Sequence, residues 1–441
     1  MNVCVYRAKR LPSELPEAQS QLPEGFPFLV DDDELEVVDV ALRYLHNEFI
    51  VMARRGSRET ADAAAYDLAD WYRYLAGIPR NWADISVDDI VDYREDRLSL
   101  ISRQTHNSLK SRTVTRRVSR VLHFYDWAST AGLYFGGALV HRETRSARRD
   151  IDRISLAHTA PASAFTSQEV SMLLPPDDSE SDINILSVDH WRTLSQQLGP
   201  LPSDKQRKEM QSKDLRNSRD RLVAEFALQT GMRADEIANL SKSQILNTKH
   251  SADLPEYSTV KIRIEKTKGR RPRFVEVPVY LLNELKLYIK GERAEAVAAS
   301  TLSSESEVPE PTSLFVNGIA AKSDAGRSIT ADTVSRRFHE AVLAEGITRT
   351  VTKVDPDTCA IYLAEVAAYS FHDLRHTFAV WTYQAERESG NAEPWKRIQV
   401  LLGHRQLHTT LDIYLKHAGT DRKPVNEKVF RAIRERFDDG D

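Results

Sequence analysis

Apolar residues recur at steps of three and four through the first third of the chain, which is the spacing of one helix face. The first series runs from Leu35 to Met52 and stops before Gly56, a residue type that commonly ends helices. Ser86 and Asp89 have the spacing of a capping box and mark another helix start. The pattern predicts a compact bundle of four helices, located at 35–54, around 66–75, from 86 onward and at 111–131.

The second half of the chain combines both periodicities. Apolar residues at every second position predict strands at 260–264 and 275–277, which the turn-like segment TKGRRP joins into a hairpin. Helical spacing predicts further helices at 219–230, 330–345, 370–388, 393–402 and 424–437. We therefore expect a mainly α fold with a small antiparallel β-sheet, in which an N-terminal helical bundle precedes a mixed α/β domain.

Segments without periodicity divide the chain into parts. The expected organisation is an irregular acidic arm at 1–34, the bundle at 35–140, a basic linker at 141–165, the α/β domain at 166–420 and a tail helix at 421–441. Polar insertions at 174–215 and 298–313 lengthen the α/β domain, and another polar stretch lies around 350–365. The pattern assigns no role to these insertions, although DHWRTLSQQL within the first is compatible with a short helix.

Composition excludes several classes of protein. The 441 residues contain no unbroken apolar run of about 20, the length that a membrane-spanning helix needs. The first residues lack the basic and then apolar build of a signal peptide. Cys4 and Cys359 are too few for a disulfide framework or a multi-thiolate metal site. These features predict a soluble globular protein of the cytoplasm.

The distribution of charge changes the picture that the total gives. The formal net charge is −4, which by itself argues against a strongly cationic protein. However, residues 1–40 hold three basic and nine acidic side chains, whereas 101–160 hold eleven basic and four acidic ones. The short segment 261–273 holds seven basic residues against one acidic residue. These two basic segments predict a local site for a polyanion, although solvated charged faces would give similar counts.

Four segments of the second half carry residues suited to chemistry. In TGMRADEIANL, Arg233 follows the helix-ending Gly231 and begins the next helix, where free N–H groups also favour a phosphate. A surface ion pair is the competing interpretation of this arginine. In SFHDLRH, Ser370 and Asp373 form a capping box, so His372 and Arg375 lie within the first turns of one helix. A proton donor beside a fixed cation suits phosphoryl transfer.

The remaining candidates leave alternatives open. His372 and His376 have the spacing of a metal pair, but no third ligand is obvious, and His376 could simply form a local hydrogen bond at the helix start. The segment IQVLLGH ends a short helix at Gly403 and presents His404. Tyr414 in TTLDIY is by default a core residue, yet a phenol is also a nucleophile toward phosphorus.

Together, these motifs resemble the tyrosine recombinases, also called the phage integrase family. The order Arg…Lys…His-x-x-Arg…His…Tyr is complete, and the resemblance covers most of the chain. It implies that 35–140 is a core-binding domain, which contacts DNA, and that 166–420 is the catalytic domain. It also implies a reaction without metal or ATP, in agreement with a sequence that has no P-loop and no acidic metal cluster.

The resemblance implies a role for each matching residue. Tyr414 would attack a DNA phosphodiester to give a 3′-phosphotyrosyl link, while Arg233 and Arg375 would clamp the phosphate oxygens. His372 would act as general acid/base and His404 would hydrogen-bond the phosphate. Lys266 in the hairpin turn would protonate the leaving 5′-oxygen, with Lys268 as the alternative.

The same resemblance implies partners. Double-stranded DNA would lie against two sets of basic residues, from the fourth helix and from the hairpin turn: Arg112, Arg116, Arg117, Arg120, Lys268, Arg270 and Arg271. Strand exchange needs four active sites, so a homo-tetramer on synapsed DNA is implied, with partner recombinases as an option. The tail helix could dock on a neighbouring protomer or on its own domain.

The function expected from these features is site-specific recombination or integration, for instance in transposition of a mobile element, close to the nucleoid of a bacterial-type cell. A telomere resolvase or a type IB topoisomerase-like strand transferase shares the chemistry. A non-catalytic DNA-binding accessory protein is the alternative from another class.

Overall fold

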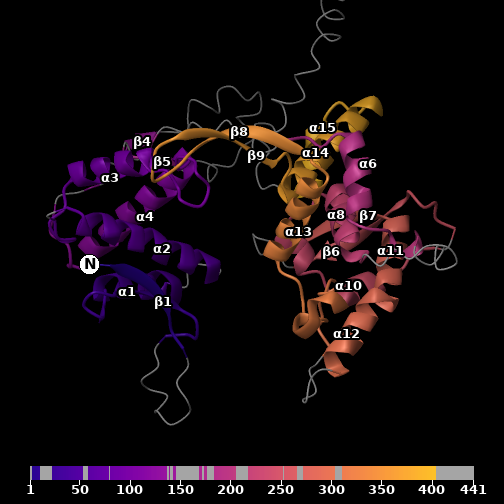
Figure 1. Cartoon of the computed structure of the whole chain (residues 1–441), viewed down its shortest axis with the longest axis horizontal. Helices are drawn as coiled ribbons and strands as arrows, with labels where there is room; N and C mark the ends of the chain where they lie inside the picture. The colour runs from indigo at the N-terminus through magenta and orange to yellow at the C-terminus, as the bar shows by residue number, and fades with distance from the viewer. Residues whose placement is uncertain are drawn as a thin grey trace, which may run out of the picture. The chain divides into compact units, whose positions relative to one another are not determined.

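The computed structural model describes the following residues: 2–9, 22–52, 58–78, 80–136, 139, 143–145, 168–170, 173–175, 183–204, 217–251, 253–265, 272–302 and 310–403. The chain is mainly helical with small antiparallel sheets, as the periodicity predicts (Figure 1). It divides into two compact units. Unit 1 comprises Met1–Glu180 with Lys353–Tyr362, and unit 2 comprises Ser181–Thr352 with Leu363–Asp441.

Unit 1 contains the expected helical bundle. Its helices are α1 (Asp39–His46), the π-helical turn η2 (Asn47–Val51), α2 (Arg58–Ala76), α3 (Val87–Ser99) and α4 (Ser111–Thr130). The capping box at Ser86 is present, with the Asp89 carboxylate accepting from the Ser86 backbone N–H at 2.7 Å. Aromatic side chains dominate the core, where Trp71 packs edge-on against Tyr93 and Tyr125. These edge-on aromatic contacts stabilise the packing of α2 against α3 and α4.

The expectation of an irregular arm at 1–34 is wrong for two segments. Strands β1 (Val3–Arg7) and β2 (Pro27–Asp31) pair antiparallel, and β3 (Glu36–Val37) extends the sheet in the order β1-β2-β3. Val3 and Leu29 are fully buried in the core of unit 1. The prolines suggested irregular chain, but Pro27 takes the first position of its strand, where a missing N–H is tolerated. The prolines at 12 and 16 lie outside the described residues.

The basic linker at 141–165 lies largely outside the described residues. Its beginning forms β4 (Glu143–Arg145), which pairs antiparallel with β5 (Gln168–Val170). This pairing could not be expected from the sequence, because three-residue strands are too short to show alternation.

Unit 2 is built around α8 (Arg219–Thr230), most of whose residues are buried. The expected hairpin is present as β6 (Thr259–Ile264) and β7 (Arg273–Pro278), paired from Thr259 opposite Pro278 to Ile264 opposite Arg273. The other helices of the unit are α6 (Val188–Gln197), α9 (Ala234–Ala238), α10 (Lys242–Leu246), α11 (Val279–Lys290), α12 (Glu292–Leu302), the 3-10 segment η5 (Ile319–Asp324), α13 (Ala331–Ala344), α14 (Phe371–Glu388) and α15 (Pro394–Leu402). One core of apolar side chains joins α8, the hairpin, α11, α13 and the start of α14.

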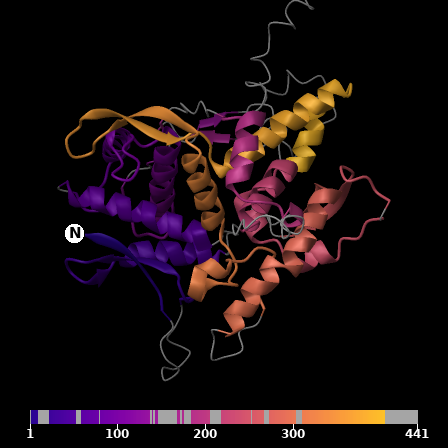
Figure 2. The same cartoon turned by 45° about the vertical axis from the view of Figure 1, so that its right-hand side comes forward.

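The polar insertions and the polar stretch contain helices and strands. Helix α12 occupies the beginning of the predicted loop at 298–313, and α6 confirms the short helix within 174–215. The polar stretch around 350–365 is the hairpin of β8 (Thr348–Val354) and β9 (Ile361–Ala367), a long two-stranded ribbon in Figures 1 and 2. Its tip belongs to unit 1, where the Val354 N–H donates to the carbonyl of His106 at 2.8 Å.

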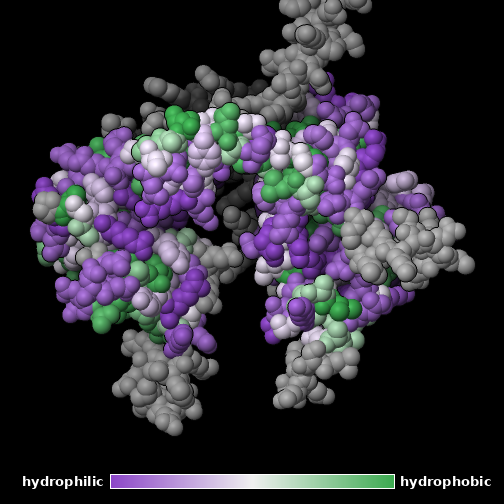
Figure 3. Space-filling model, in the orientation of Figure 1, coloured by the Kyte–Doolittle hydropathy of each residue, from purple (hydrophilic) through white to green (hydrophobic). Residues whose placement is uncertain are grey.

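The β8–β9 ribbon carries apolar side chains on its surface. Ile361 is 74% exposed and Leu363 72% exposed, and the ribbon accordingly shows green patches in Figure 3. None of the helices in the described part of the chain is both long enough and apolar enough to cross a bilayer.

Candidate active site

The first candidate, Arg233, lies where α8 turns into α9. Helix α8 ends at Gly231, whose φ of +64° is the left-handed conformation that glycine adopts without strain. A Cβ at this position would lie 2.5 Å from a ring carbon of Phe378, so the close approach of α14 also requires glycine. Two residues later, Arg233 is the N-cap of α9, with 29% of its side chain exposed. The predicted helix start is therefore confirmed.

A buried carboxylate, Glu236, organises this helix start. The backbone N–H of Arg233 donates to Glu236 Oε2 at 3.0 Å, and Arg233 Nη1 approaches Glu236 Oε1 at 3.3 Å. Arg273 Nη2, from the beginning of β7, also donates to Glu236 Oε2, at 2.8 Å. The carboxylate has no exposed surface. One buried anion thus holds two arginines that lie on different elements.

The neighbours of Glu236 keep it ionised. Burial raises the pKa of this carboxyl, but the charge and hydrogen bond of Arg273, the Arg233 backbone N–H and the charge of Arg375 outweigh burial, so its pKa is lowered overall. Three guanidinium groups therefore act on one carboxylate. The surplus of positive charge makes this position suitable for a bound anion.

The predicted start of the helix that carries Arg375 is confirmed, but the inward direction of the Arg375 side chain was not expected. The capping box of α14 is present, since Ser370 N–H donates to Asp373 Oδ2 at 2.7 Å. Arg375 is only 2% exposed and points inward. Its Nη1 donates to the carbonyl of Gly231, and its Nη2 donates to the carbonyl of Leu402 at 2.8 Å. Arg375 therefore connects α14 to the ends of α8 and α15.

His372 lies in the first turn of α14 and is exposed, unlike Arg375. Its ring contacts that of His376 edge-on, with centroids 4.7 Å apart. Within the described ranges, no three His, Cys, Asp or Glu side chains are grouped as metal ligands would be, so the structure supplies no third ligand to this pair. His372 has the exposure that a group exchanging protons with a substrate requires.

The C-terminal end of α15 meets the same group of arginines. Gly403 ends the helix in the left-handed conformation, as the sequence predicts, with φ of +67°. The carbonyl of Leu401 accepts from Arg273 Nη1, and that of Leu402 accepts from Arg375. His404 and Tyr414 follow this end but lie outside the described residues, as do Lys266, Lys268, Arg270 and Arg271 of the hairpin turn.

Two of the residues that build this site were missed from sequence. Glu236 and Arg273 were not singled out, although Arg273 belongs to the basic segment 261–273. The spacing of Arg233 and Glu236, three apart at a helix start, is the available signal for Glu236. No local signal marks Arg273, because its partners are distant in sequence.

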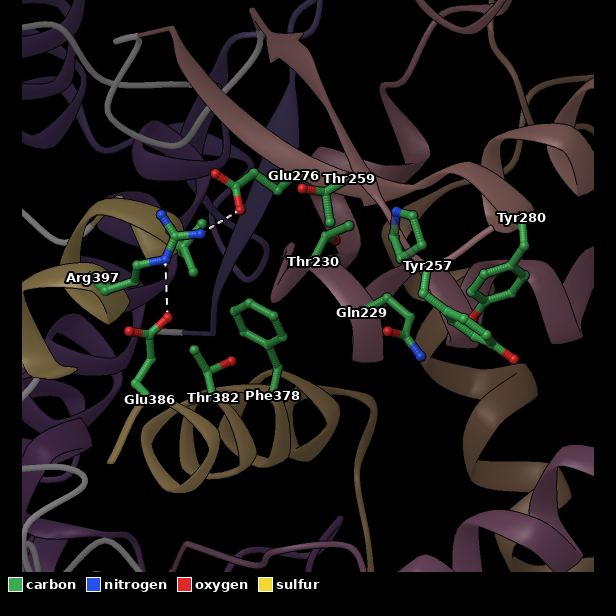
Figure 4. A pocket seen from close by; sticks show the side chains of 12 residues that line it. Gln229, Thr230, Tyr257, Thr259, Glu276, Tyr280, Phe378, Thr382, Glu386 and Arg397 are labelled. Atoms are coloured by element: carbon green, nitrogen blue, oxygen red, sulfur yellow. Dashed lines mark hydrogen bonds and ion pairs between the residues drawn. The ribbon is translucent and has the colours of Figure 1, made fainter. Parts of the chain in front are cut away.

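A separate cavity of about 330 Å³ lies in unit 2 (Figure 4). Arg397 of α15 crosses one side of it, with Nη2 2.6 Å from Glu276 Oε2 and Nε 3.2 Å from Glu386 Oε1. Phe378 and Tyr280 supply apolar walls. None of the predicted site residues that the structure describes lines this cavity.

The predicted DNA-binding arginines of α4 are only partly available to solvent. Arg117 Nη1 pairs with Asp70 Oδ2 at 2.9 Å, and Arg120 Nη1 donates to the hydroxyl of Tyr44 at 3.1 Å. Arg112 is exposed, and Arg116 is 48% exposed although its Nη1 pairs with Asp67 Oδ2 at 2.6 Å. Arg112 and Arg116 are thus the members of the stripe that remain open to a ligand. The α2 carboxylates of Asp67 and Asp70, which pair with Arg116 and Arg117, were not anticipated from sequence.

Asp67 provides a test of this packing. Burial raises the pKa of Asp67 to about 6, against the opposing charges of Arg116, Arg117 and Arg120. The folded state binds the proton of the Asp67 carboxyl more tightly than the unfolded state does. The stability that protonated Asp67 contributes is therefore lost as pH rises from about 4 to above 6. Asparagine stays neutral at every pH. We therefore expect the free energy of unfolding of Asp67→Asn to rise by up to about 2 kcal/mol relative to that of wild type between pH 4 and pH 8. Urea unfolding at both pH values measures the difference in free energy of unfolding between variant and wild type. A difference that does not change with pH contradicts the prediction.

One family model matches the part of the chain that carries the candidate site. The model of the phage integrase family matches residues 206–420, a range that includes Arg233, His372, Arg375, His404 and Tyr414. No curated protein sequence is significantly similar to the chain.

Three solved structures are similar to the chain to different degrees. XerH site-specific recombinase, bound to its palindromic difH substrate in a post-cleavage complex, is 15% identical with a TM-score of 0.50, covering 91% of this chain and 90% of that chain. A lambda integrase dimer bound to a COC′ core site is 15% identical with a TM-score of 0.46, covering 85% and 76%. Tn1549 transposon integrase with a circular intermediate DNA is 13% identical with a TM-score of 0.46, covering 85% and 94%.

The likeness to XerH shows a shared fold, and the family model spans the segment that carries Arg233, Glu236 and Arg375. Residues 206–420 of the chain belong to the phage integrase family, the tyrosine recombinases.

Proposed function

We propose that this protein is a site-specific DNA recombinase or integrase that cleaves and rejoins DNA strands through a covalent 3′-phosphotyrosyl intermediate, in the service of a mobile element. The observation that carries the proposal is the group formed by Arg233, Arg273, Arg375 and the single carboxylate of Glu236. Its surplus of about two positive charges suits a phosphodiester, whose pentacoordinate transition state carries more negative charge than the ground state.

Each step of the reaction uses a residue of this chain. The phenol oxygen of Tyr414 forms a bond to phosphorus while the bond from phosphorus to the 5′-oxygen breaks, and His372 takes the phenol proton. Lys266, or alternatively Lys268, gives a proton to the 5′-oxygen, which leaves as a hydroxyl. His404 hydrogen-bonds the phosphate. Rejoining reverses these steps with a 5′-hydroxyl from another strand, so the reaction needs no metal and no ATP.

The two arginines have different parts in this proposal. Arg233, whose side chain is 29% exposed, would contact a phosphate oxygen directly. Arg375 is buried and fixed by two carbonyls, so its charge acts from a constant position. A preorganised cation of this kind needs no reorganisation as negative charge develops.

The partners follow from the same chemistry. We propose that unit 1 contributes the core-binding domain and unit 2 the catalytic domain, with boundaries near 35–140 and 166–420. Double-stranded DNA is the substrate, and four copies of the chain assemble on synapsed DNA, alone or with partner recombinases. A lambda integrase tetramer has been solved on a Holliday junction. The tail at 421–441 would help this assembly by docking within or between protomers, in the cytoplasm at the nucleoid.

Covalent capture tests the proposal and requires no assumption about the target sequence. Wild-type protein is incubated in EDTA with a pool of nicked duplexes of random sequence, and DNA that remains attached in SDS is recovered and sequenced. We expect enrichment of one sequence family with wild type and no attachment with Tyr414→Phe. Absence of attachment with wild type would favour the non-catalytic accessory protein, and attachment only with added divalent metal would contradict the mechanism.

The recovered sequence then separates the enzymatic alternatives. A recombinase forms recombinant products from two copies of the site, a telomere resolvase closes ends into hairpins, and a topoisomerase only relaxes supercoils. We expect recombinant products. Relaxation of supercoils without recombinant products would contradict the recombinase and favour the topoisomerase alternative.

The exposure of the α4 arginines predicts how DNA affinity depends on salt. Each contact to a phosphate releases counterions, so removing one lowers the slope of log K against log salt by about 1. We expect this change for Arg112→Ala and for Arg116→Ala, measured on the captured duplex at several salt concentrations. Arg43→Ala, which removes a 60% exposed arginine of α1 paired with Asp39, is the control and should leave the slope unchanged. Equal slopes for all four proteins would remove α4 from the interface.

A further inference from the structure

Arg273 occupies a position that connects several parts of unit 2. It begins β7 and lies opposite Ile264, the last residue of β6, so these two residues bring together the ends of the segment between the strands. Its side chain is 11% exposed and is buried among elements that come from distant parts of the sequence. Keeping a charged side chain in such a place costs desolvation energy, which favourable interactions must offset.

The guanidinium of Arg273 bonds in two directions. On one side, Nη2 donates to Glu236 Oε2 at 2.8 Å, and Glu236 in turn holds Arg233. On the other side, Nη1 donates to the carbonyl of Leu401. Carbonyls in the last turn of a helix have no partner within the helix, so this bond ties down the end of α15.

Arg375 makes the equivalent bond one residue later. Its Nη2 donates to the carbonyl of Leu402, while its Nη1 donates to Gly231. Two consecutive carbonyls of α15 are therefore held by two arginines from β7 and α14. The position of this helix end is set from two sides.

The backbone at Gly403 lies directly against Arg273. A Cβ placed on Gly403 would come within 2.6 Å of Arg273 Cδ, and the φ of +67° already disfavours other residues. The aliphatic part of Arg273 thus contacts the turn from which the chain continues to residue 404.

We propose that Arg273 is a positioning residue of the strand-transfer site. It fixes two chain positions against the Glu236–Arg233 pair: the start of β7, which follows the segment with Lys266 and Lys268, and the end of α15, which precedes His404. This inference rests on the proposed function, because the two segments matter together only if they act on one phosphate. Arg273 itself contacts protein groups and acts through them.

Three variants separate positioning from simple stabilisation. Arg273→Met keeps an unbranched side chain of similar shape to the aliphatic part of arginine, without its charge or donors, and Arg273→Lys keeps the charge with a single nitrogen. Gly403→Ala leaves Arg273 intact but displaces it from the turn. Arg397→Met is the matched control, because Arg397 also connects α15 to β7, through Glu276, at a place away from Glu236.

The measurements are the single-turnover cleavage rate and the dissociation constant on the captured duplex. Displacement of catalytic groups by about 1 Å costs about 100-fold in rate. We expect this loss for Arg273→Met and for Gly403→Ala, about a tenfold loss for Arg273→Lys, and DNA affinity within twofold of wild type for all. Arg397→Met should cleave within threefold of wild type.

Amide hydrogen exchange gives a readout that does not depend on DNA. We expect peptides covering 398–403 to exchange faster in Arg273→Met than in Arg397→Met. Unchanged exchange, an unchanged cleavage rate, or a parallel loss of rate and affinity would each overturn the role of Arg273. Failure of wild type to attach to any DNA would instead overturn the proposed function, so the two failures are distinguishable.

Discussion

Replacing Arg375 by alanine is expected to abolish covalent attachment to DNA and to destabilise unit 2. The variant removes a charge that the proposed mechanism places at the phosphate, and loss of such an arginine costs at least about 1,000-fold in phosphoryl transfer. It also leaves the buried carbonyls of Gly231 and Leu402 without this donor, at about 1–3 kcal/mol each. Single-turnover cleavage and urea unfolding measure the two effects separately.

A matched control distinguishes lost chemistry from lost stability. Arg293 is another buried arginine of unit 2, and it donates to the carbonyls of Ser313 and Pro311 far along the chain from the candidate site. Arg293→Ala should reduce stability to a similar degree, while the protein that remains folded cleaves DNA normally. Equal loss of cleavage in both variants would show that Arg375 has only a structural role.

Replacing Glu236 by glutamine is expected to lower both stability and cleavage. The change removes the carboxylate that Arg233 and Arg273 share, and breaking a buried pair in this way costs about 3–5 kcal/mol. We expect cleavage to fall with stability, because both arginines lose the group that orients them. Unfolding at neutral pH and cleavage of the captured duplex measure the two losses.

The effect of Glu236→Gln should depend on pH in a defined direction. Burial raises the pKa of Glu236, but Arg273 and the other positive groups lower it by more than burial raises it. The folded-state pKa therefore lies below the usual 4.5. The stability that ionised Glu236 contributes is therefore present above pH 4.5 and is lost as pH falls through the lower folded-state pKa. Wild type and variant should converge in strong acid. A difference that is constant with pH would show that the charge of Glu236 is not what stabilises the site.

Glu225 supplies the control for this experiment. It is also a buried carboxylate of unit 2, but it pairs with Arg221 four residues away on the same helix, at 2.6 Å. Glu225→Gln should leave cleavage by the folded protein unchanged.

Local features of the site were predictable from sequence. The helix start at Ser370 follows from capping spacing, and the helix ends at Gly231 and Gly403 follow from the preference of glycine for the left-handed conformation. The helix start at Arg233 was predicted because it lies just past Gly231. Each depends on residues within four positions of one another. The helical bundle was predictable for the same reason, since its periodicity is a local property.

Contacts between distant residues were not predictable. Arg273 and Glu236 are 37 positions apart, and Arg116 and Asp67 are 49 apart, so no spacing rule connects them. The stripe of arginines on α4 was interpreted from α4 alone. Because α2 packs beside it and supplies Asp67 and Asp70, two of those arginines face protein as well as solvent.

The short and exposed elements were missed for a different reason. Strands β1 and β2 have five residues each, with Pro27 at the first position of β2. The two strands of the β8–β9 hairpin contain no buried residue. Alternation of apolar residues is a signal of burial on one face, so a largely exposed ribbon does not show it.

The identity of the residue that becomes attached to DNA decides whether Tyr414 is the nucleophile of strand transfer. The captured complex is digested with nuclease and trypsin, and the peptide that carries a nucleotide is sequenced by mass spectrometry. We predict a nucleotide joined through its 3′-phosphate to Tyr414, with no adduct in Tyr414→Phe. An adduct on any other residue, or linkage through a 5′-phosphate, would contradict the proposed chemistry.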